Sequence, residues 1–178
     1  TENAPDDDKT ETIRLPSWWR LIGSMNDADK ASLKRLSYAF VRRFAFIPIA
    51  IPPVDIYNNL LETGAGGGSD GLAATRPDFL IALKDLFAEP SGLASIDMAM
   101  GYAIPEAMMR QARSEISFDV GRSTDSLLAS ALDLCVAPQF QGRADKHEGL
   151  LGLVSKYLGA DQSKAFASRL AVWTGFVE

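Results

Sequence analysis

The chain has 178 residues, of which 47% are apolar and 9% aromatic, and its formal net charge is -5. A chain of this length can bury a core without disulfides or a metal ion, and its single cysteine excludes an internal disulfide bond. The longest apolar run, residues 44–54, is shorter than the roughly 18 residues of a membrane span and contains three prolines. We therefore expect a soluble, cytoplasmic protein that does not bind a membrane.

The acidic charge is concentrated at the start of the chain. Five acidic residues and one lysine lie within the first twelve positions, so residues 13–178 carry a net charge of only -1. Such a segment cannot bury enough apolar surface to offset the entropy lost when it becomes ordered. We expect a disordered acidic tail over residues 1–14.

A basic helix is predicted after this tail. A short helix is expected first, capped by Ser17 and ending near Gly23. A longer helix follows, capped by Asn26 or Asp27 and ended by prolines from Pro48 onward. Between positions 30 and 43 it carries five basic residues and no acidic one, opposite an apolar stripe. The five are Lys30, Lys34, Arg35, Arg42 and Arg43. This face suits a polyanion; the alternative is a solvated face covered by carboxylates from elsewhere in the fold.

A glycine-rich stretch divides the chain. Residues 55–63 are predicted to form another helical turn or two, and five glycines lie between positions 64 and 71. The spacing Gly66-x-Gly68-x-x-Gly71 matches a dinucleotide-binding fingerprint, but no strand is predicted before it, so a linker or mobile loop is favoured. The expected segments are an acidic tail (1–14), an N-terminal helical segment (15–63), a glycine-rich linker or loop (64–76) and a C-terminal helical bundle (77–178).

Helical spacing dominates the remaining hundred residues. It predicts a helix over 77–88, an interrupted helix over 91–103, and helices that begin near Pro105, Ser123 or Thr124, Asp145 and Asp161. Alternation of period two, typical of strands, is confined to 46–51 and 116–120. We predict an all-α fold, a compact bundle of about seven to nine helices arranged as one body or as two small lobes joined by the glycine-rich linker.

Few residues indicate catalysis. Cys135 lies on the apolar face of its predicted helix, where burial would raise the pKa of its thiol, and His147 is predicted at an exposed helix start. The acids Asp119, Asp125 and Asp133 are explained as capping or polar-face residues. No cluster of histidine and cysteine has the spacing of a metal site. We expect no enzyme activity, no metal and no cofactor; a small enzyme that depends on acidic residues is a third alternative.

Two further sets of residues suit binding. A second basic set comprises Arg110, Arg113 and Arg122, but Glu106 is a local partner of Arg110, which weakens the case for a polyanion site there. Trp18 and Trp19 stand beside Arg20, an arrangement that can stack on unpaired bases; packing in a core is the alternative.

Several segments follow one another in a familiar order. They are Trp18-Trp19-Arg20-Leu21, Ala31-Ser32-Leu33-Lys34-Arg35, the helices over 79–86 and 110–113, Asp125-Ser126-Leu127-Leu128 and Leu170-Ala171-Val172-Trp173. In this layout, over nearly its whole length, the chain resembles the small subunit of type I-E CRISPR surveillance (Cascade) complexes. The resemblance implies a helical, non-enzymatic protein that stabilises the guide RNA–target heteroduplex and the displaced strand through basic helix faces. It implies this role for Lys34, Arg35, Arg42, Arg43, Arg110 and Arg113.

We therefore predict a non-catalytic helical subunit of a nucleoprotein effector complex. Its expected partners are other subunits of the assembly, further copies of itself, and the phosphates of RNA or single-stranded DNA. The predicted nucleic-acid-binding residues are Lys30, Lys34, Arg35, Arg42, Arg43, Arg110 and Arg113. The alternative is a self-assembling viral or phage coat protein built of helices, in which the apolar run 44–54 lies across a neighbouring subunit.

Overall fold

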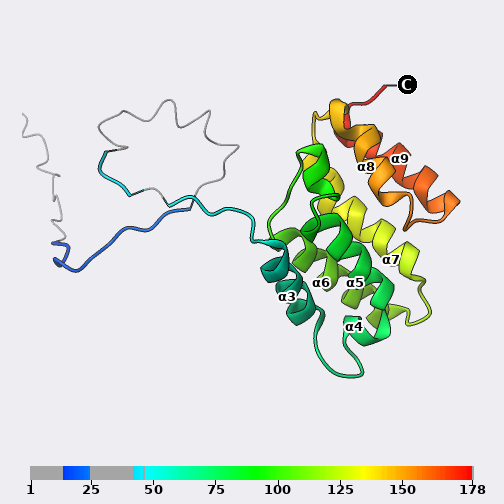
Figure 1. Ribbon diagram of the computed structural model, residues 1–178, viewed down its shortest axis with the longest axis horizontal. Coiled ribbons are helices and arrows are strands. Elements are labelled where there is room, and N and C mark those ends of the chain that lie inside the picture. Colours follow the sequence, from blue (N-terminus) through cyan, green and yellow to red (C-terminus); the bar gives the residue numbers. More distant parts are fainter. Residues whose placement is uncertain (1–13, 25–41, 46, 178) are drawn as a thin grey trace, which may run out of the picture. The chain divides into compact units, whose positions relative to one another are not determined.

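The computed structural model describes residues 14–24, 42–45 and 47–177 (Figure 1). Within these ranges the chain forms seven α-helices and several short 3₁₀ and π-helical segments, and no β-strand. The chain divides into two units, residues 1–48 and 49–178, and the second contains all of these elements. The all-α prediction is confirmed for the described residues. The division between units lies at residue 48 and not in the glycine-rich stretch.

Residues 14–24 of the first unit have an irregular backbone that contains one turn. The backbone N–H of Trp19 donates to the Pro16 carbonyl at 3.0 Å and closes the turn. The Arg20 guanidinium donates to the carbonyls of Ser17 and Trp19. The predicted short helix is therefore absent. So few residues form a stable helix only when packing supports them, and every side chain here is exposed.

The predicted basic helix lies mostly outside the described residues. Residues 25–41 and 46 are not described, and they include Lys30, Lys34 and Arg35. The described residues 42–45 form a turn and a bend, where the sequence predicted the last turn of the helix. Four residues before Pro48, the chain is thus already non-helical.

The second unit is a succession of helical elements joined by short connections. Their bounds are α3 (Val54–Ala65), α4 (Leu72–Thr75), α5 (Pro77–Leu83), η2 (Lys84–Ala88), η3 (Leu93–Ile96), α6 (Ala103–Phe118), α7 (Thr124–Ala131), η4 (Leu132–Val136), η5 (Ala137–Phe140), η6 (Ala144–Lys146), α8 (His147–Val154) and α9 (Ala160–Thr174). The predicted helix start at Pro77 is confirmed. The interrupted helix expected over 91–103 forms only the single 3₁₀ turn of η3.

Two of the helices change pitch before they end. Segment η2 continues α5 directly as a π-helix, and η4 continues α7 in the same way. A π-helical turn widens the backbone and shifts the side chains after it to a new angle; such turns are frequent at functional sites. Each segment contains one aspartate, Asp85 in η2 and Asp133 in η4.

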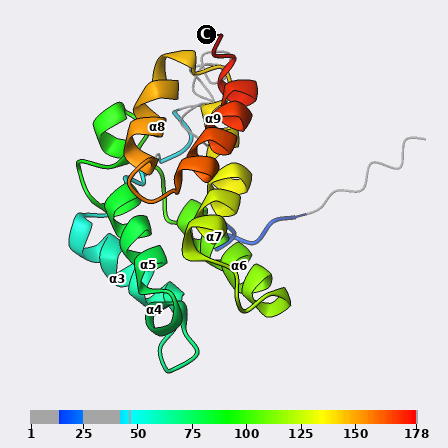
Figure 2. The same ribbon diagram turned by 90° about the vertical axis from the view of Figure 1, so that its right-hand side faces the viewer.

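Helix α6 is the longest helix of the second unit among the described residues. It packs against α3, α7 and η4, while α8 and α9 lie side by side (Figures 1 and 2). The buried side chains of α6 are Pro105, Met108, Met109 and Ala112, spaced by three or four residues as one helical face requires. The largest fully buried residues outside α6 are Tyr57, Leu61, Phe79, Leu83, Leu86, Leu93, Leu127, Leu128, Phe140 and Phe166.

The glycine-rich stretch is a loop inside the second unit. It connects α3 to α4, and both helices contact α5, so the stretch does not separate two lobes. Gly66 and Gly68 have φ values of 82° and 93°, a region that residues with a Cβ rarely adopt. These glycines let the chain reverse direction within a few residues.

His147 is buried, contrary to the expectation of an exposed helix start. Its side chain stands at the first residue of α8, is 3% exposed and stacks on Phe176 with ring centroids 4.3 Å apart. Its Nδ1 lies 3.0 Å from the Thr174 hydroxyl oxygen. That hydroxyl donates to the Leu170 carbonyl, so it accepts from an Nδ1–H. The prediction was wrong because the spacing of α8 cannot show that the end of α9 covers its first residue.

The close approach of Gly92 to η2 gives a stability test. A Cβ at Gly92 would collide with the carbonyl oxygens of Asp85 and Leu86, which belong to the backbone and cannot rotate away. We expect Gly92→Ala to lower the free energy of unfolding by about 1–3 kcal/mol in urea denaturation. Gly152, inside α8, has open space around it, and Gly152→Ala should raise stability by about 0.5–1 kcal/mol. Equal effects of the two substitutions would contradict this packing.

Candidate functional site

The predicted basic residues fall in both units. Arg42 and Arg43 belong to the first unit, and Arg110 and Arg113 lie on α6 in the second. All four residues are exposed. Lys30, Lys34 and Arg35 lie outside the described residues. Among the described members of the predicted set, Arg42 and Arg43 are adjacent in the first unit, and Arg110 and Arg113 share one face of α6 in the second.

Arg113 has a role within the fold. Its Nη2 donates a hydrogen bond to the carbonyl of Gly64, in the last turn of α3. Carbonyls in the last turn of a helix lack a partner within the helix, and a cation there also offsets the partial negative charge of the helix end. Arg113 therefore ties α6 to α3, and its guanidinium is only partly available to a ligand.

Arg110 stands on the same face without such a bond. The expected pairing with Glu106, four residues earlier, does not form, and Arg110 makes no hydrogen bond or ion pair with another described residue. Its charge acts on the thiol of Cys135: burial raises the pKa of this thiol, and Arg110 opposes part of that rise. Arg110 is thus a cation on the surface of the bundle with no acid to neutralise it among the described residues.

The segment 14–24 displays aromatic and basic side chains together. Trp18 is 76% exposed and Trp19 is 41% exposed, and Arg14 and Arg20 are exposed beside them. The sequence left open whether these tryptophans pack in a core, and in this segment they do not. Exposed aromatic rings next to guanidinium groups are the features on which unpaired bases stack.

Charge is divided unequally along the chain. Residues 13–54 contain seven basic and two acidic residues, whereas residues 55–178 contain ten basic and sixteen acidic ones. A polyanion is attracted to the first of these stretches and repelled by the net charge of the second. The arginines of α6 are therefore local exceptions on an acidic bundle.

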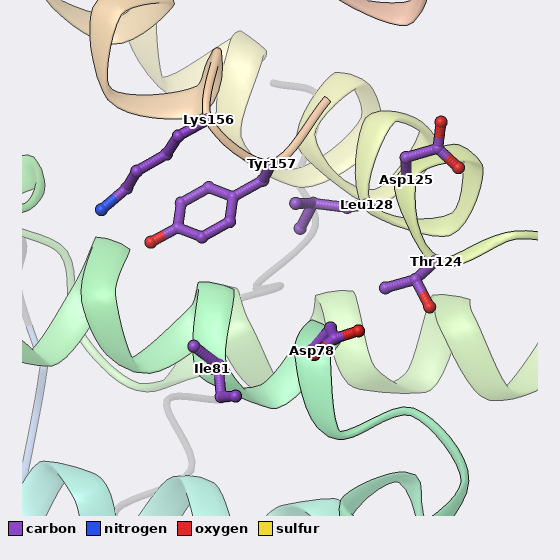
Figure 3. A pocket seen from close by; sticks show the side chains of 7 residues that line it. All are labelled: Asp78, Ile81, Thr124, Asp125, Leu128, Lys156 and Tyr157. Atoms are coloured by element: carbon purple, nitrogen blue, oxygen red, sulfur yellow. The ribbon is translucent and has the colours of Figure 1, made fainter. Parts of the chain in front are cut away.

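One surface hollow lies between α5, α7 and the segment that follows α8 (Figure 3). Its volume is about 370 Å³, and it is lined by Asp78, Ile81, Thr124, Asp125, Leu128, Lys156 and Tyr157. Lys156 and Asp125 stand at opposite ends of it in Figure 3. The charged groups of this hollow are therefore spread along it and do not converge on one point.

Most polar groups of this hollow are bonded within the fold. The Tyr157 hydroxyl donates to Asp85 in η2, and Lys156 Nζ lies 3.3 Å from the same carboxylate. Burial, with the Asp85 hydrogen bond, raises the pKa of Tyr157. Asp125 accepts a hydrogen bond from Ser123 and others from the backbone of Ser126 and Gly159, and these bonds lower its pKa. This cluster holds the segment after α8 against α5 and α7.

A second hollow, which we call the polar hollow, has a different lining. Its volume is about 390 Å³, and it is lined by Arg122, Ser126, Ala129, Ser130, Asp133, Gln162 and Arg169. These residues come from α7, η4, α9 and the loop before α7. Two guanidinium groups, two hydroxyls, an amide and a carboxylate thus face one open space, although they are spread over 48 positions of sequence.

Two ion pairs hold the arginines of the polar hollow. Arg122 Nε lies 3.0 Å from Glu115 Oε2, and Arg169 Nε lies 2.5 Å from Asp133 Oδ2. The Glu115 and Asp133 side chains are only 13% and 19% exposed. Burial raises the pKa of Asp133, and the charge of Arg169 opposes the rise. The Asp133 carboxylate is thus kept charged in part by its contact with Arg169.

Three buried atoms around the polar hollow lack a hydrogen bond. They are Asp133 Oδ1, Glu115 Oε2 and Arg122 Nε. The last two face each other at ion-pair distance, but the N–H is not aligned on the oxygen. Buried polar atoms are nearly always hydrogen-bonded in proteins, so the fold does not fully satisfy the polar groups at this edge of the core. Sequence spacing gave no sign of this site, because its residues meet only in the tertiary structure.

No family model, curated protein or solved structure matches the chain. Within residues 14–24, 42–45 and 47–177, no group of three or more histidine, cysteine or acidic residues could hold a metal ion. No helix in the described part of the chain is long and apolar enough to cross a membrane.

The hydrogen bonds of Asp125 predict a pH-dependent contribution to stability. Because its folded pKa is lowered, the contribution is present above the unfolded pKa of about 3.9 and is lost as the pH falls through the folded value. We expect Asp125→Ala to be less stable than wild type near neutral pH, with the difference shrinking below about pH 4.

Thermal unfolding across pH measures this difference. The matched control is Asp78→Ala. Asp78 lies in the first turn of α5 and lines the same hollow, but its carboxylate does not accept the hydrogen bonds that Asp125 accepts. A deficit in Asp125→Ala that stays constant down to about pH 2 would show that the carboxylate charge is not what these bonds stabilise.

Proposed function

We propose that the chain is a non-catalytic nucleic-acid-binding subunit of a larger nucleoprotein complex. In this proposal the N-terminal segment contacts single-stranded RNA or DNA, and the helical bundle provides the surface for other subunits. The observation that carries the proposal is the exposure of Trp18 and Trp19 beside Arg14 and Arg20, at the start of the one basic stretch of an acidic protein.

The side chains favour a single strand over a duplex. Bases in a duplex present only their edges, whereas a flat aromatic ring needs the face of an unstacked base. The adjacent arginines supply charge for the phosphates on either side. The layout shared with the small subunits of Cascade complexes suggests the guide RNA or the displaced DNA strand as the physiological target.

The arginines of α6 offer a separate phosphate contact within the second unit. Arg110 has no acidic partner among the described residues, so binding a phosphate would break no ion pair. Arg113 would have to weaken its hydrogen bond to Gly64. We expect Arg110 to contribute more to binding than its neighbour on the same face.

Binding of a fluorescent oligonucleotide tests this proposal. We expect affinity for single-stranded RNA or DNA that weakens as salt increases, because each phosphate contact releases counterions. Trp18→Ala should weaken binding by about 5- to 150-fold, the effect of losing one stacked base at 1–3 kcal/mol. Fluorescence anisotropy at several salt concentrations measures both effects.

The matched control is Trp173→Ala. Trp173 is also exposed, at 40% against 76% for Trp18, but it lies on α9 in the other unit. This variant should bind as wild type does. Binding that is absent, or that is insensitive to salt and equally reduced in both variants, would refute the proposal.

A second candidate function, self-assembly into a coat or scaffold, rests on another exposed segment. Ile47, Ile49 and Ile51 are 83%, 95% and 41% exposed. They alternate with Pro48, Ala50 and Pro52 along residues without regular secondary structure. An exposed apolar run of this kind marks a surface for another protein, and prolines prevent it from adding indiscriminately to strands.

Light scattering coupled to size exclusion tests self-assembly. If the run lies across a neighbouring copy, wild type should form oligomers and Ile47→Ser/Ile49→Ser should shift the mass toward the monomer. Val172→Ser, which alters a residue on α9 that is also 83% exposed, is the matched control. A wild-type monomer at about 100 μM, where even weak interfaces associate, would exclude this function.

A further inference from the structure

The polar hollow presents hydrogen-bond donors that nothing in the fold uses. Arg122 and Arg169 each meet their carboxylate through Nε, and their terminal nitrogens form no hydrogen bond with another described residue. The Ser126 hydroxyl accepts from Gln162 Nε2 at 3.3 Å, which leaves its own proton unused. The free ends of two guanidinium groups and one hydroxyl suit an oxyanion, because planar guanidinium forks match the geometry of phosphate and carboxylate oxygens.

The same hollow presents acceptors that a plain anion would not satisfy. Asp133 Oδ1 is buried without a partner, and Gln162 uses its amide nitrogen on Ser126, which leaves its oxygen free. An anion without protons would face the Asp133 carboxylate unfavourably. A ligand that also carries a hydroxyl could donate to the Asp133 carboxylate, which lines the hollow, while its anionic group meets the arginines.

The groups that form this site are held in place by the fold. Glu115 is fixed by hydrogen bonds from Gln111 at 2.8 Å and from the Ser130 hydroxyl, and it in turn holds Arg122. Asp133 projects from the π-helical segment η4 and holds Arg169 of α9. Arginines positioned in this way lose less side-chain entropy when they bind a ligand.

We propose that the polar hollow binds a phosphate ester that carries a hydroxyl group, with the phosphate between Arg122 and Arg169 and the hydroxyl on Asp133. The volume of about 390 Å³ falls within the range of small-molecule sites. A sugar phosphate has this chemistry, and so has the phosphorylated terminal nucleotide of an RNA strand. The site lies in the bundle and does not depend on nucleic-acid binding by the N-terminal segment.

Calorimetric titration of the full chain with ribose 5-phosphate tests the site. We expect saturable binding with a Kd of about 1 mM or tighter, and binding at least about tenfold weaker for inorganic phosphate and for ribose, because each supplies only one half of the ligand. Titration with a 5′-phosphorylated RNA dinucleotide and with its 5′-hydroxyl counterpart shows whether the ligand is an RNA strand end or a free sugar phosphate. Preference for the phosphorylated dinucleotide over ribose 5-phosphate identifies a strand end, and the reverse identifies a free metabolite.

Variants locate the binding. Arg169→Lys keeps a positive charge opposite Asp133 but removes the guanidinium fork. This variant should weaken the binding of ribose 5-phosphate by about tenfold or more. Asp133→Asn should reduce the preference for ribose 5-phosphate over inorganic phosphate. Lys164→Gln, an exposed position on the same helix α9, is the matched control and should bind as wild type does. If Arg169→Lys does not fold by circular dichroism, Arg122→Lys takes its place with the same expected result.

Two outcomes overturn the proposal. One is the absence of saturable binding of ribose 5-phosphate by wild type. The other is binding that the arginine variants leave unchanged, or that is reduced equally in Lys164→Gln, since either result would place the ligand elsewhere. Trp18→Ala should leave this titration unaffected, so failure of the site and failure of nucleic-acid binding can be told apart.

Discussion

Burial of one face of α6 is the constraint on which the rest of the bundle depends. Met108, Met109 and Ala112 are removed from water between α3, α7 and η4. Because a helix is rigid, fixing this face also fixes the direction of every other side chain on it. Arg110 and Arg113 are therefore directed outward, and Arg113 reaches the end of α3. Glu115, three residues beyond Ala112, is carried to the edge of the core, where it meets residues of the next helix and loop.

Polar contacts at the edges of the core set how the later helices join it. Asp85 in η2 accepts a hydrogen bond from Tyr157 and forms an ion pair with Lys156, both in the segment after α8. Asp133 in η4 forms an ion pair with Arg169 of α9. Both aspartates stand in π-helical segments, where the local change of pitch turns them toward an element far along the chain. Partly buried ion pairs contribute little net stability, since desolvation opposes their attraction, but they penalise any packing that separates them. These pairs therefore select one arrangement of helices more than they strengthen it.

The two units differ in the surfaces they offer. The described part of the first unit exposes aromatic, aliphatic and basic side chains on a backbone with few internal hydrogen bonds. The second unit buries a continuous apolar core, although several of its large apolar side chains are exposed, and it carries a net negative charge. A segment that exposes so much apolar surface gains stability only by covering it, and its basic residues favour an anionic partner. This contrast is the physical basis for assigning recognition of a polymer to the N-terminal segment and a small-ligand site to the bundle.

Sequence alone determined the helical class of this protein and most helix positions after residue 53. Apolar spacing, together with Pro77 at a helix start, reports on contacts within a few residues, and those are the contacts that define a helix. The prediction of a short helix before Gly23 was wrong because packing against other elements does not support the local helix propensity. The burial of His147 and the meeting of Arg122, Asp133 and Arg169 were decided by tertiary structure. Such contacts join residues from separate helices, and the angles at which helices cross leave no periodic trace in the sequence.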